Sequence, residues 1–311
     1  MREHKLVSVI GGNGFLGKYI VNNLLNKGYY IKIISRTATL SKQNFTINKP
    51  GQYKLVNCDI KNFIQLKSEL EGSDYVINLV GLLVNKKNNS FKDVHELAVK
   101  NIALTCKKLK IKKIIHVSAI GAQKNSKSEY SKTKFYGEEA VKTFDNHCIL
   151  RPSIIYGDED NFINFFAKTA KKSPFLPLIG GGRNLFQPIW VQDVANIIVN
   201  ILEKNIKGKV LEIGGLEVFT FKKILEIILE ELELKRILIN IPYGVSTRIA
   251  SLLEFLPNPL LTKDQVEMLK KDNIISKKYD YRKTLEYLPM PFEKIVRNQL
   301  SFMKKNGGHL N

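Results

Sequence analysis

The feature that most constrains this chain is a glycine-rich turn close to its start. Four glycines, Gly11, Gly12, Gly14 and Gly17, fall within seven residues and directly follow the apolar run Leu6–Ile10. Runs rich in Val and Ile are typical of buried parallel strands, so we predict a strand here. Glycines placed directly after a strand permit a tight turn and let a bulky anion approach the backbone.

A helix is expected directly after this turn. Apolar residues recur at Leu16, Tyr19, Ile20, Leu24 and Leu25, close to the helical period. The N-terminus of such a helix offers unpaired N–H groups and the positive end of a dipole, which suit a pyrophosphate. An ordinary glycine-rich turn is the alternative, but the strand–turn–helix context favours nucleotide binding.

Strand-like and helix-like segments alternate along the first half of the chain. The expected strands are Leu6–Ile10, Tyr30–Ile34, Tyr53–Val56, Tyr75–Val80, Lys113–Val117 and Cys148–Leu150. The expected helices are Leu16–Asn26, Phe63–Leu70, Phe91–Leu109 and Lys132–Phe144. Strict alternation is typical of an α/β fold with a doubly wound parallel sheet, the architecture of NAD(P)-binding Rossmann domains.

The alternation weakens past Arg151, where turns rich in Pro and Gly appear at Pro174–Gly182 and Pro257–Pro259. We therefore predict two domains. Residues 1–155 form the Rossmann domain, and residues 156–311 form a smaller mixed domain for substrate or partner docking. Because Val210–Ile213 is strand-like, part of the 186–215 region is expected to complete the sheet of the first domain.

The composition is that of a soluble globular protein, with 44% hydrophobic and 25% charged residues. The three cysteines, Cys58, Cys106 and Cys148, are scattered, so neither a disulfide framework nor a metal site is expected. The sequence has no run of 18 apolar residues that could span a membrane. Since the first strand is predicted from Leu6 onward, we expect no signal peptide and a cytoplasmic location.

The formal charge of +20 admits nucleic acid, an anionic membrane surface or an acidic partner. Lysines number 41 and arginines only 8, an excess that A/T-rich codon usage alone would produce. The lysines are spread along the chain and suit solvated helix faces. No patch of Arg and aromatic residues indicates base readout, so nucleic acid is not expected. Peripheral binding at the inner face of the plasma membrane stays open.

Ser35, Arg36 and Thr37 follow the second predicted strand. A site that prefers NAD usually has an Asp or Glu at this point, which accepts hydrogen bonds from the ribose 2′-hydroxyl. A guanidinium between two hydroxyl-bearing residues suits a 2′-phosphate instead. We therefore predict that the site prefers NADP(H), with NAD(H) as the alternative cofactor. A surface Arg without a cofactor role is the alternative.

Tyr130 and Lys134 lie one turn apart at the head of a predicted helix, on the same face. A nearby ammonium lowers the pKa of a phenol, so Tyr130 can exchange a proton with a carbinol or carbonyl while hydride moves to or from nicotinamide. A Tyr-x-x-x-Lys pair is common by chance. Its place after His116-Val117-Ser118 and before Gly137-Glu138 makes the pair more specific.

These segments together resemble the extended short-chain dehydrogenase/reductase superfamily. The matching residues are Gly11-x-x-Gly14-x-x-Gly17, Asp59, Asn78–Gly81, Asn101, Tyr130-x-x-x-Lys134 and Leu150–Gly157. The resemblance implies that the glycines hold the pyrophosphate, that Asp59 and Ile60 hold the adenine, and that Lys134 binds the nicotinamide ribose. The cofactor-binding residues expected in total are Gly11, Gly12, Asn13, Gly14, Phe15, Leu16, Gly17, Ser35, Arg36, Thr37, Asp59, Ile60, Val80, Gly81, Val117, Tyr130, Lys134 and Pro152.

A closer resemblance covers nearly the whole chain. The segments Leu176–Arg183, Phe186–Ala195, Leu256–Val266 and Asp272–Ser276 are similar to the bacterial relatives of the accessory Rossmann subunit of respiratory complex I. That family holds NADPH tightly as a structural cofactor beside the quinone-entry region, and it is similar to proteins implicated in ubiquinone synthesis. The resemblance implies NADPH as the cofactor, complex I subunits as partners and a link to ubiquinone handling.

The sequence departs from the family's catalytic pattern after the fifth strand. Active members usually have a Ser/Thr-rich stretch there, whereas this chain has Ser118-Ala119-Ile120-Gly121, only about a dozen residues before Tyr130. Tyr130, Lys134 and Ser118 are the candidate catalytic residues of the alternative function, an active NADP-dependent reductase or epimerase. A weak Ser position fits a retained cofactor site better, and Lys134 alone would serve to hold NADPH, so turnover stays open.

Tyr243–Leu256 predicts one further helix, with an apolar face that includes Val245, Ile249, Leu252 and Phe255. Packing of that helix on its own domain is the simplest interpretation. The alternative is a face docked on a membrane-arm subunit or lying in the bilayer interface, where surrounding lysines would add attraction.

Overall fold

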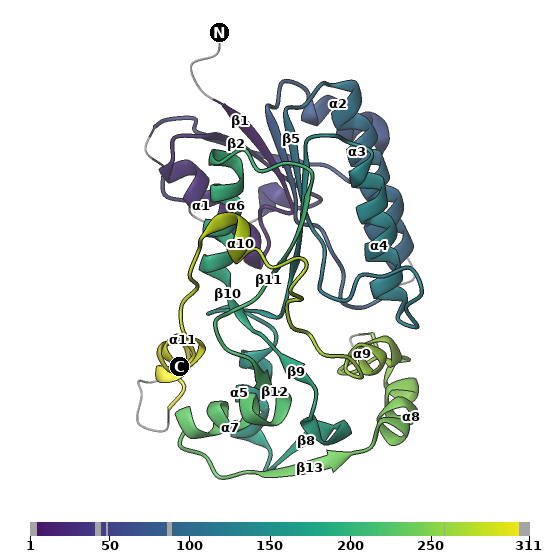
Figure 1. Ribbon diagram of the computed structural model, residues 1–311, viewed down its shortest axis with the longest axis vertical. Coiled ribbons are helices and arrows are strands. Elements are labelled where there is room, and N and C mark those ends of the chain that lie inside the picture. The colour runs from purple at the N-terminus through teal and green to yellow at the C-terminus, as the bar shows by residue number, and fades with distance from the viewer. Residues whose placement is uncertain (1–4, 41–44, 48, 86–88, 258, 305–311) are drawn as a thin grey trace. The chain divides into compact units, whose positions relative to one another are not determined.

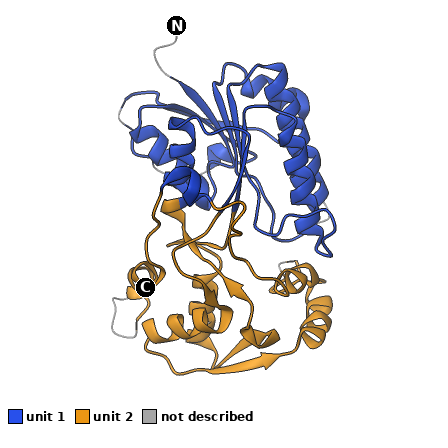
Figure 2. Cartoon of the chain, in the orientation of Figure 1, with its two compact units in different colours: residues 1–151, 194–212, 281–286 blue, residues 152–193, 213–280, 287–311 orange. Residues whose placement is uncertain are grey.

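The structure, a computed structural model, describes residues 5–40, 45–47, 49–85, 89–257 and 259–304. The chain divides into two compact units (Figure 2). Unit 1 comprises residues 1–151, 194–212 and 281–286, and unit 2 comprises residues 152–193, 213–280 and 287–311. Asn258, in the predicted turn at Pro257–Pro259, and residues 1–4 lie outside the described ranges.

A seven-stranded sheet forms the centre of unit 1. Its spatial order is β11 (Lys209–Ile213), β6 (His147–Pro152), β5 (Lys113–Val117), β4 (Tyr75–Asn78), β1 (Leu6–Ile10), β2 (Tyr30–Ser35) and β3 (Tyr53–Asn57). All neighbouring pairs among β1 to β6 are parallel. Strand β11 follows the direction of β6, because Gly208 N–H donates to His147 O at one end and Ser153 N–H donates to Ile213 O at the other. The predicted doubly wound parallel sheet is confirmed.

Helices cover both faces of this sheet (Figure 1). One face carries α1 (Phe15–Asn26) and α6 (Val191–Glu203), and the other carries α2 (Phe63–Leu70), α3 (Ala98–Lys108) and α4 (Glu129–Lys142). Short helical turns lie at Ala38–Leu40 and at α10 (Arg282–Leu285). Because both faces are covered, strand residues such as Val7, Val9 and Ile10 are fully buried.

The segment before α3 departs from the predicted continuous α-helix over Phe91–Leu109. Lys92–Leu97 is a π-helix, in which Ala98 N–H donates to Asp93 O five residues back. Helix α4 packs against this π-helix so closely that a Cβ on Gly137 would lie 2.1 Å from His95 O. The two backbones can approach this closely only because residue 137 is a glycine.

A buried group of ions ties α4 to the sheet. Arg151, at the end of β6, donates to both carboxylate oxygens of Glu138 on α4, at 2.8 and 2.6 Å. Its Nη1 also lies 3.5 Å from Glu212 Oε1 on β11. Glu138 is fully buried, so removing the guanidinium would leave an uncompensated charge at a cost of about 3–5 kcal/mol. The bidentate pair therefore fixes α4 on the strand that follows it in the sequence.

Unit 2 combines three two-stranded sheets with five helices among its described residues. The sheets pair β7 (Ile155–Tyr156) with β10 (Ile189–Trp190), β9 (Leu185–Phe186) with β12 (Phe219–Thr220), and β8 (Phe175–Ile179) with β13 (Ile237–Ile241). The helices are α5 (Ile163–Lys172), α7 (Phe221–Glu231), α8 (Tyr243–Leu253), α9 (Lys263–Met268) and α11 (Phe292–Ser301), and Gly180–Gly182 forms a 3-10 turn.

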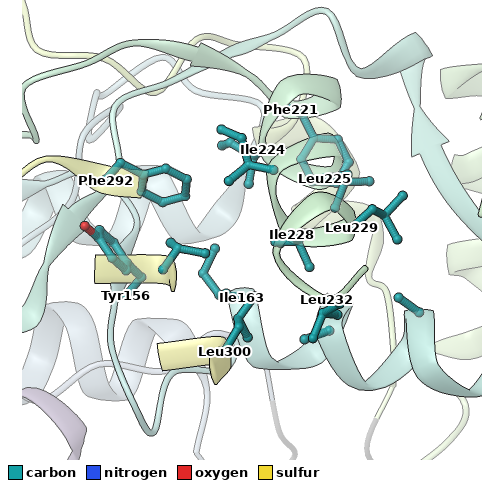
Figure 3. Close-up of a cluster of buried hydrophobic side chains, with 14 of the residues drawn as sticks. Tyr156, Ile163, Phe221, Ile224, Leu225, Ile228, Leu229, Leu232, Phe292 and Leu300 are labelled. Carbon is teal, nitrogen blue, oxygen red and sulfur yellow. The ribbon is translucent and has the colours of Figure 1, made fainter. Parts of the chain in front are cut away.

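The core of unit 2 is built on one face of α7 (Figure 3). Phe221, Ile224, Leu225 and Ile228 follow the helical period and are all buried. The rings of Tyr156 and Phe292 pack edge to face beside them, with centroids 4.9 Å apart. Unit 2 therefore has an apolar core of its own.

Two of the segments that carry the complex I resemblance meet inside unit 2. Gln187 donates from Nε2 to Gly215 O at 2.7 Å and accepts from Ile275 N–H at 3.1 Å. Asn273 N–H donates to Leu185 O, and Ser153 Oγ donates to Asn273 O. These segments thus hold the unit 2 backbone together through buried polar groups.

The apolar face of α8 lies at the surface of the chain. Ser246 and Ala250 are buried, whereas Val245, Ile249 and Leu252 are exposed, Leu252 by 73%. Phe255, just beyond the helix, is 89% exposed. None of the helices in the described ranges has the length and apolar character needed to cross a membrane.

Gly137→Ala tests the close packing of α4 on the π-helix. We expect the substitution to lower the free energy of unfolding by about 2–3 kcal/mol, because the new methyl group meets a carbonyl oxygen that cannot move independently. Urea denaturation followed by circular dichroism measures the change. Gly244→Ala is the matched control, since a Cβ there meets nothing within 4 Å and a helical alanine gains up to about 1 kcal/mol. Equal stability of the two variants would contradict the packing argument.

Candidate functional site

The turn after β1 is held by its own backbone. Gly11 has φ +81°, its N–H donates to Ile34 O at 2.8 Å, and its O accepts from Gly14 N–H at 3.0 Å. A Cβ on Gly17 would lie only 2.4 Å from Gly11 O, so the start of α1 rests directly on the turn. The first turn of α1 has no acidic residue, which leaves its N–H groups available to an anion.

A pocket opens beside this turn at the carboxyl ends of β1 to β4. Eight of its lining residues were predicted to bind the cofactor: Asn13, Ser35, Arg36, Thr37, Asp59, Ile60, Val80 and Gly81. Sequence reasoning missed six more: Ile10, Cys58, Lys61, Leu82, Asn89 and Val94. Lys61 directly follows the predicted Asp59-Ile60 pair and could have been found, whereas nothing in the sequence points to Asn89.

The remaining predicted residues lie around this pocket or apart from it. Gly11 borders the pocket, since a Cβ there would lie 3.3 Å from Val80 Cγ2. Gly12, Gly14, Phe15, Leu16 and Gly17 belong to the turn and the start of α1 rather than to the pocket lining. Pro152 ends β6 and belongs to unit 2, so its contact with a cofactor stays a prediction.

The polar rim of the pocket carries charges of both signs. Arg36 Nη1 donates to Asn89 Oδ1 at 3.1 Å. Asp59 Oδ1 accepts from Lys61 N–H at 3.0 Å, and its Oδ2 lies 3.8 Å from Lys61 Nζ. Ser35 Oγ accepts from Thr37 N–H at 3.2 Å, so the residues after β2 form a compact turn. The position that holds an acid in NAD-preferring sites thus presents a guanidinium.

Tyr130 and Lys134 lie on the first turns of α4, which begins at Glu129 and not at the predicted Lys132. Ser128 caps this helix by accepting from Ser131 N–H at 3.1 Å. Lys134 Nζ lies over the Tyr130 ring, 5.8 Å from its centroid, and donates to Val117 O at 3.3 Å. The predicted residues Tyr130, Lys134 and Val117 are therefore neighbours.

Lys134 also reaches the edge of the pocket. A Cβ on Gly81 would lie 3.1 Å from Lys134 Nζ, so glycine at position 81 leaves room for the ammonium. Burial lowers the pKa of Lys134 to about 8, although the Glu138 carboxylate opposes that shift. An amine that is close to its pKa and has N–H donors to spare can bind a hydroxyl or exchange a proton.

His95, from the π-helix, is the main site residue that sequence reasoning missed. Leu82 N–H donates to its Nε2 at 2.9 Å, so Nε2 is the acceptor and Nδ1 carries the proton. Nδ1 lies 3.2 Å from Thr133 Oγ1, which lies 2.9 Å from Glu129 O. Burial, with Lys134 contributing, lowers the pKa of His95 to about 2, so the ring is neutral. His95 therefore connects the loop after β4 to the head of α4.

Two buried side-chain atoms, His116 Nε2 on β5 and Ser118 Oγ just beyond it, lack a hydrogen-bond partner among the described residues. Asn78 Nδ2 donates to His116 Nδ1 at 3.0 Å, which leaves the proton on His116 Nε2 without an acceptor. Ser118 Oγ is equally unpaired, and its residue is only 3% exposed. Unpaired buried groups are costly and are found where a ligand completes the bonding. The predicted catalytic role of Ser118 stays a prediction.

The described residues contain no group of three or more His, Cys, Asp or Glu side chains that could hold a metal ion. Cys58, Cys106 and Cys148 are free and buried. Burial raises the pKa of the Cys58 thiol to about 11, so this pocket residue is not a reactive thiolate at neutral pH.

Residues 7–214 match the model of the NAD dependent epimerase/dehydratase family. The chain belongs to that family. The match covers β1 to β11 and with them the whole pocket, the Tyr130–Lys134 pair and Ser118. The predicted resemblance to the extended short-chain dehydrogenase/reductase superfamily is thereby confirmed.

Two relatives of this chain carry the name of a subunit of one particular enzyme. The NADH dehydrogenase (ubiquinone) 1 alpha subcomplex subunit 9, mitochondrial, of Arabidopsis thaliana is 31% identical over 285 residues, covering 87% of this chain and 71% of the relative. The protein of the same name from Dictyostelium discoideum is 31% identical over 313 residues, covering 98% of this chain and 86% of the relative. The predicted resemblance to a subunit of NADH:ubiquinone oxidoreductase is therefore confirmed.

A solved structure agrees with the fold. The dTDP-glucose 4,6-dehydratase of Streptomyces venezuelae, solved with NAD bound, matches with a TM-score of 0.75 over 97% of both chains. Its sequence identity of 17% limits the comparison to the fold.

Lys134→Met tests whether the buried ammonium destabilises the folded chain. At pH 7 the amine is charged in both the folded and the unfolded chain, so the full cost of its burial is present. Replacing it should raise the free energy of unfolding by about 2–3 kcal/mol. As the pH rises through 8, the folded chain loses this proton while the unfolded chain keeps it to about pH 10.5. The advantage of the variant should therefore shrink between pH 8 and 10.

The measurement is urea denaturation of the nucleotide-free protein at pH 7, 8, 9 and 10. Lys132→Met, on the exposed side of the same helix, is the control and should match the wild type throughout. If Lys134→Met is less stable than the wild type at pH 7, the ammonium does not destabilise the folded chain.

Proposed function

We propose that this protein is an NADP(H)-binding accessory component of a respiratory NADH:ubiquinone oxidoreductase, in which the cofactor is held and not turned over. The main support is similarity that extends through both units, to relatives that carry the name of that enzyme. The family match, which ends at residue 214, supports nucleotide binding by unit 1.

The residues after β2 support NADP(H) over NAD(H). Arg36 stands in the pocket where an acid would bind the 2′-hydroxyl, with Ser35 and Thr37 beside it. A guanidinium binds a phosphate through charge-assisted hydrogen bonds. The 2′-phosphate that distinguishes NADP(H) would therefore gain a charge-assisted bond here, whereas the uncharged 2′-hydroxyl of NAD(H) would not.

A held cofactor agrees with the chemistry around Lys134. Among the described residues of unit 1 the ammonium has one hydrogen-bond acceptor, Val117 O, so the hydroxyls of a nicotinamide ribose would complete its bonding. Ser118 is buried, and Ala119-Ile120-Gly121 after it offers no second hydroxyl for a substrate carbonyl. The site can bind the nicotinamide half strongly and still lack the groups that polarise a substrate.

The α8 face supports peripheral docking beside a quinone-handling assembly. Val245, Ile249 and Leu252 form an exposed apolar stripe on a chain that carries a net charge of +20. An apolar stripe on a strongly cationic chain suits an anionic membrane surface or a membrane-bound partner subunit. A cytoplasmic protein attached to the inner face of the plasma membrane, with a link to ubiquinone, is the arrangement that we propose.

An active NADP-dependent reductase or epimerase is the second candidate. The observation that favours it is the contact of Lys134 with the Tyr130 ring, together with an amine pKa of about 8. In that function Tyr130 acts as the acid or base, Lys134 assists it, and a small carbonyl compound or quinone precursor is the substrate.

Arg36→Ala tests the cofactor preference. We expect the dissociation constant of NADPH to rise about 30-fold and that of NADH to change less than about threefold, because only the former carries the 2′-phosphate. Isothermal titration calorimetry at fixed ionic strength measures both. Arg248→Ala, an exposed arginine on α8, is the control for loss of charge. Equal losses for the two nucleotides would overturn the preference for NADP(H).

Native-gel fractionation of mildly solubilised membranes tests the partnership. We expect the chain to co-migrate with the respiratory complex and to retain NADPH that added carbonyl compounds do not oxidise. Leu252→Asp should abolish co-migration without unfolding, since it places a charge on the docking face. Ile64→Asp, on α2 and 81% exposed in the wild type, is the control and should still co-migrate. A soluble species that oxidises NADPH with a carbonyl substrate would support the reductase instead.

A further inference from the structure

Two cationic side chains meet at one oxygen on the pocket rim. Arg36 Nη1 donates to Asn89 Oδ1 at 3.1 Å, and Lys61 Nζ donates to the same oxygen at 3.3 Å. The three residues come from separate segments, after β2, after β3 and after β4, and all three line the pocket. The loops at the carboxyl ends of these strands thus converge on a single hydrogen-bond acceptor.

This acceptor is electrostatically poor for two cations. An amide oxygen has two lone pairs and can accept both bonds, but it carries no net charge. The Asp59 carboxylate lies 3.8 Å from the Lys61 ammonium, and both side chains are more than a third exposed, so that pair is weak. Two positive groups within two hydrogen-bond lengths of each other repel unless an anion lies between them. The arrangement therefore favours an anion that carries more than one negative charge.

The geometry points to Lys61 as the second cation, beside Arg36, that binds the 2′-phosphate of NADP(H), with Asn89 Oδ1 marking the position of one phosphate oxygen. This assignment rests on the proposed function and extends it to a residue outside the Ser35–Thr37 turn. Asn89 contributes as a positioning residue, because its amide draws the Arg36 and Lys61 side chains to one point.

The location agrees with a 2′-phosphate rather than a pyrophosphate. The pyrophosphate of a dinucleotide lies at the N-terminus of the helix after the first strand, whereas the adenine ribose lies at the end of the second strand. Lys61 follows Asp59 and Ile60 at the end of β3, the next strand along the edge of the sheet. The two cations would bind the phosphate in different ways, because a guanidinium can bind two phosphate oxygens while an ammonium acts as a compact point charge.

Lys61 has a further effect on Asp59. A carboxylate beside a bound phosphate would repel it. The ammonium of Lys61 lies 3.8 Å from Asp59 Oδ2 and 3.3 Å from Asn89 Oδ1, so it would stand close to both negative groups. Lys61 thus offsets the Asp59 charge on one side and attracts the phosphate on the other. Loss of this ammonium removes an attraction and exposes a repulsion, so its effect should exceed that of an ordinary surface lysine.

The test compares adenosine 2′,5′-bisphosphate with adenosine 5′-monophosphate, which differ only by the 2′-phosphate. We expect Lys61→Met to weaken binding of the bisphosphate about tenfold and to leave binding of the monophosphate within about twofold. Lys61→Arg should restore most of the lost affinity. Asn89→Asp should weaken the bisphosphate at least as much as Lys61→Met, because its carboxylate would occupy both cations and repel the phosphate.

Lys67→Met is the matched control, since Lys67 is an exposed lysine on α2 outside the pocket and its loss changes the net charge equally. Isothermal titration calorimetry on the full chain gives each constant, and melting temperatures show that every variant is folded. Unchanged bisphosphate binding by Lys61→Met overturns the assignment of Lys61 while the proposed function stands. A wild-type chain that binds neither adenosine phosphate nor NADPH overturns the proposed function and the Lys61 assignment together.

Discussion

Unit 1 depends on two places where the backbone approaches another backbone without an intervening side chain. Gly17 lets α1 rest on the glycine turn, and Gly137 lets α4 pack against the π-helix at His95. A Cβ at either glycine would lie within 2.6 Å of main-chain atoms, so no rotamer change can relieve the clash. These contacts set the positions of the start of α1 and the head of α4. Close packing of the backbone therefore helps to place both helices.

A buried ion pair also holds α4 in position, in addition to the close packing at Gly137. The Arg151–Glu138 pair is bidentate and holds α4 to β6, with Glu212 as a second acceptor on β11. About one turn before Glu138, on the same side of α4, Lys134 is buried with a carbonyl oxygen as its acceptor. Glu138, whose charge is compensated by Arg151, thus lies only four residues from Lys134, whose hydrogen bonding is incomplete. Natural proteins accept such a cost where a ligand completes the bonding, which agrees with the proposed role of Lys134 in holding a cofactor.

The sequence was sufficient for the fold and for most of the pocket, and the reason is periodicity. Strands β1 and β5 and helix α2 begin and end where the apolar pattern predicts, since each buries one run or one face against the rest of unit 1. The π-helix at Lys92–Leu97 could not be predicted, because its spacing is imposed by contact with α4. His95 and Asn89 were also missed, because their roles depend on contacts with residues far away in the sequence. Their partners, Leu82, Thr133, Arg36 and Lys61, are distant in sequence, so no local pattern marks them. Lys61 lies two residues after the predicted site residue Asp59, but nothing else in the sequence distinguishes it from the other lysines among the 41.

The state of His95 bears on whether the site holds a cofactor or turns one over. Both ring nitrogens are engaged, Nε2 by Leu82 N–H and Nδ1 by Thr133 Oγ1, and burial with the charge of Lys134 keeps the imidazole neutral. An imidazole in this state cannot pass protons to Lys134 or Tyr130, because neither nitrogen is free to accept one. It can, however, fix the loop that carries Gly81 against the helix that carries Lys134. A reductase needs a route by which the proton given to its substrate is replaced, whereas a retained cofactor needs rigid donors. The arrangement around His95 supplies rigidity, and for that reason it favours a nucleotide that is held in place.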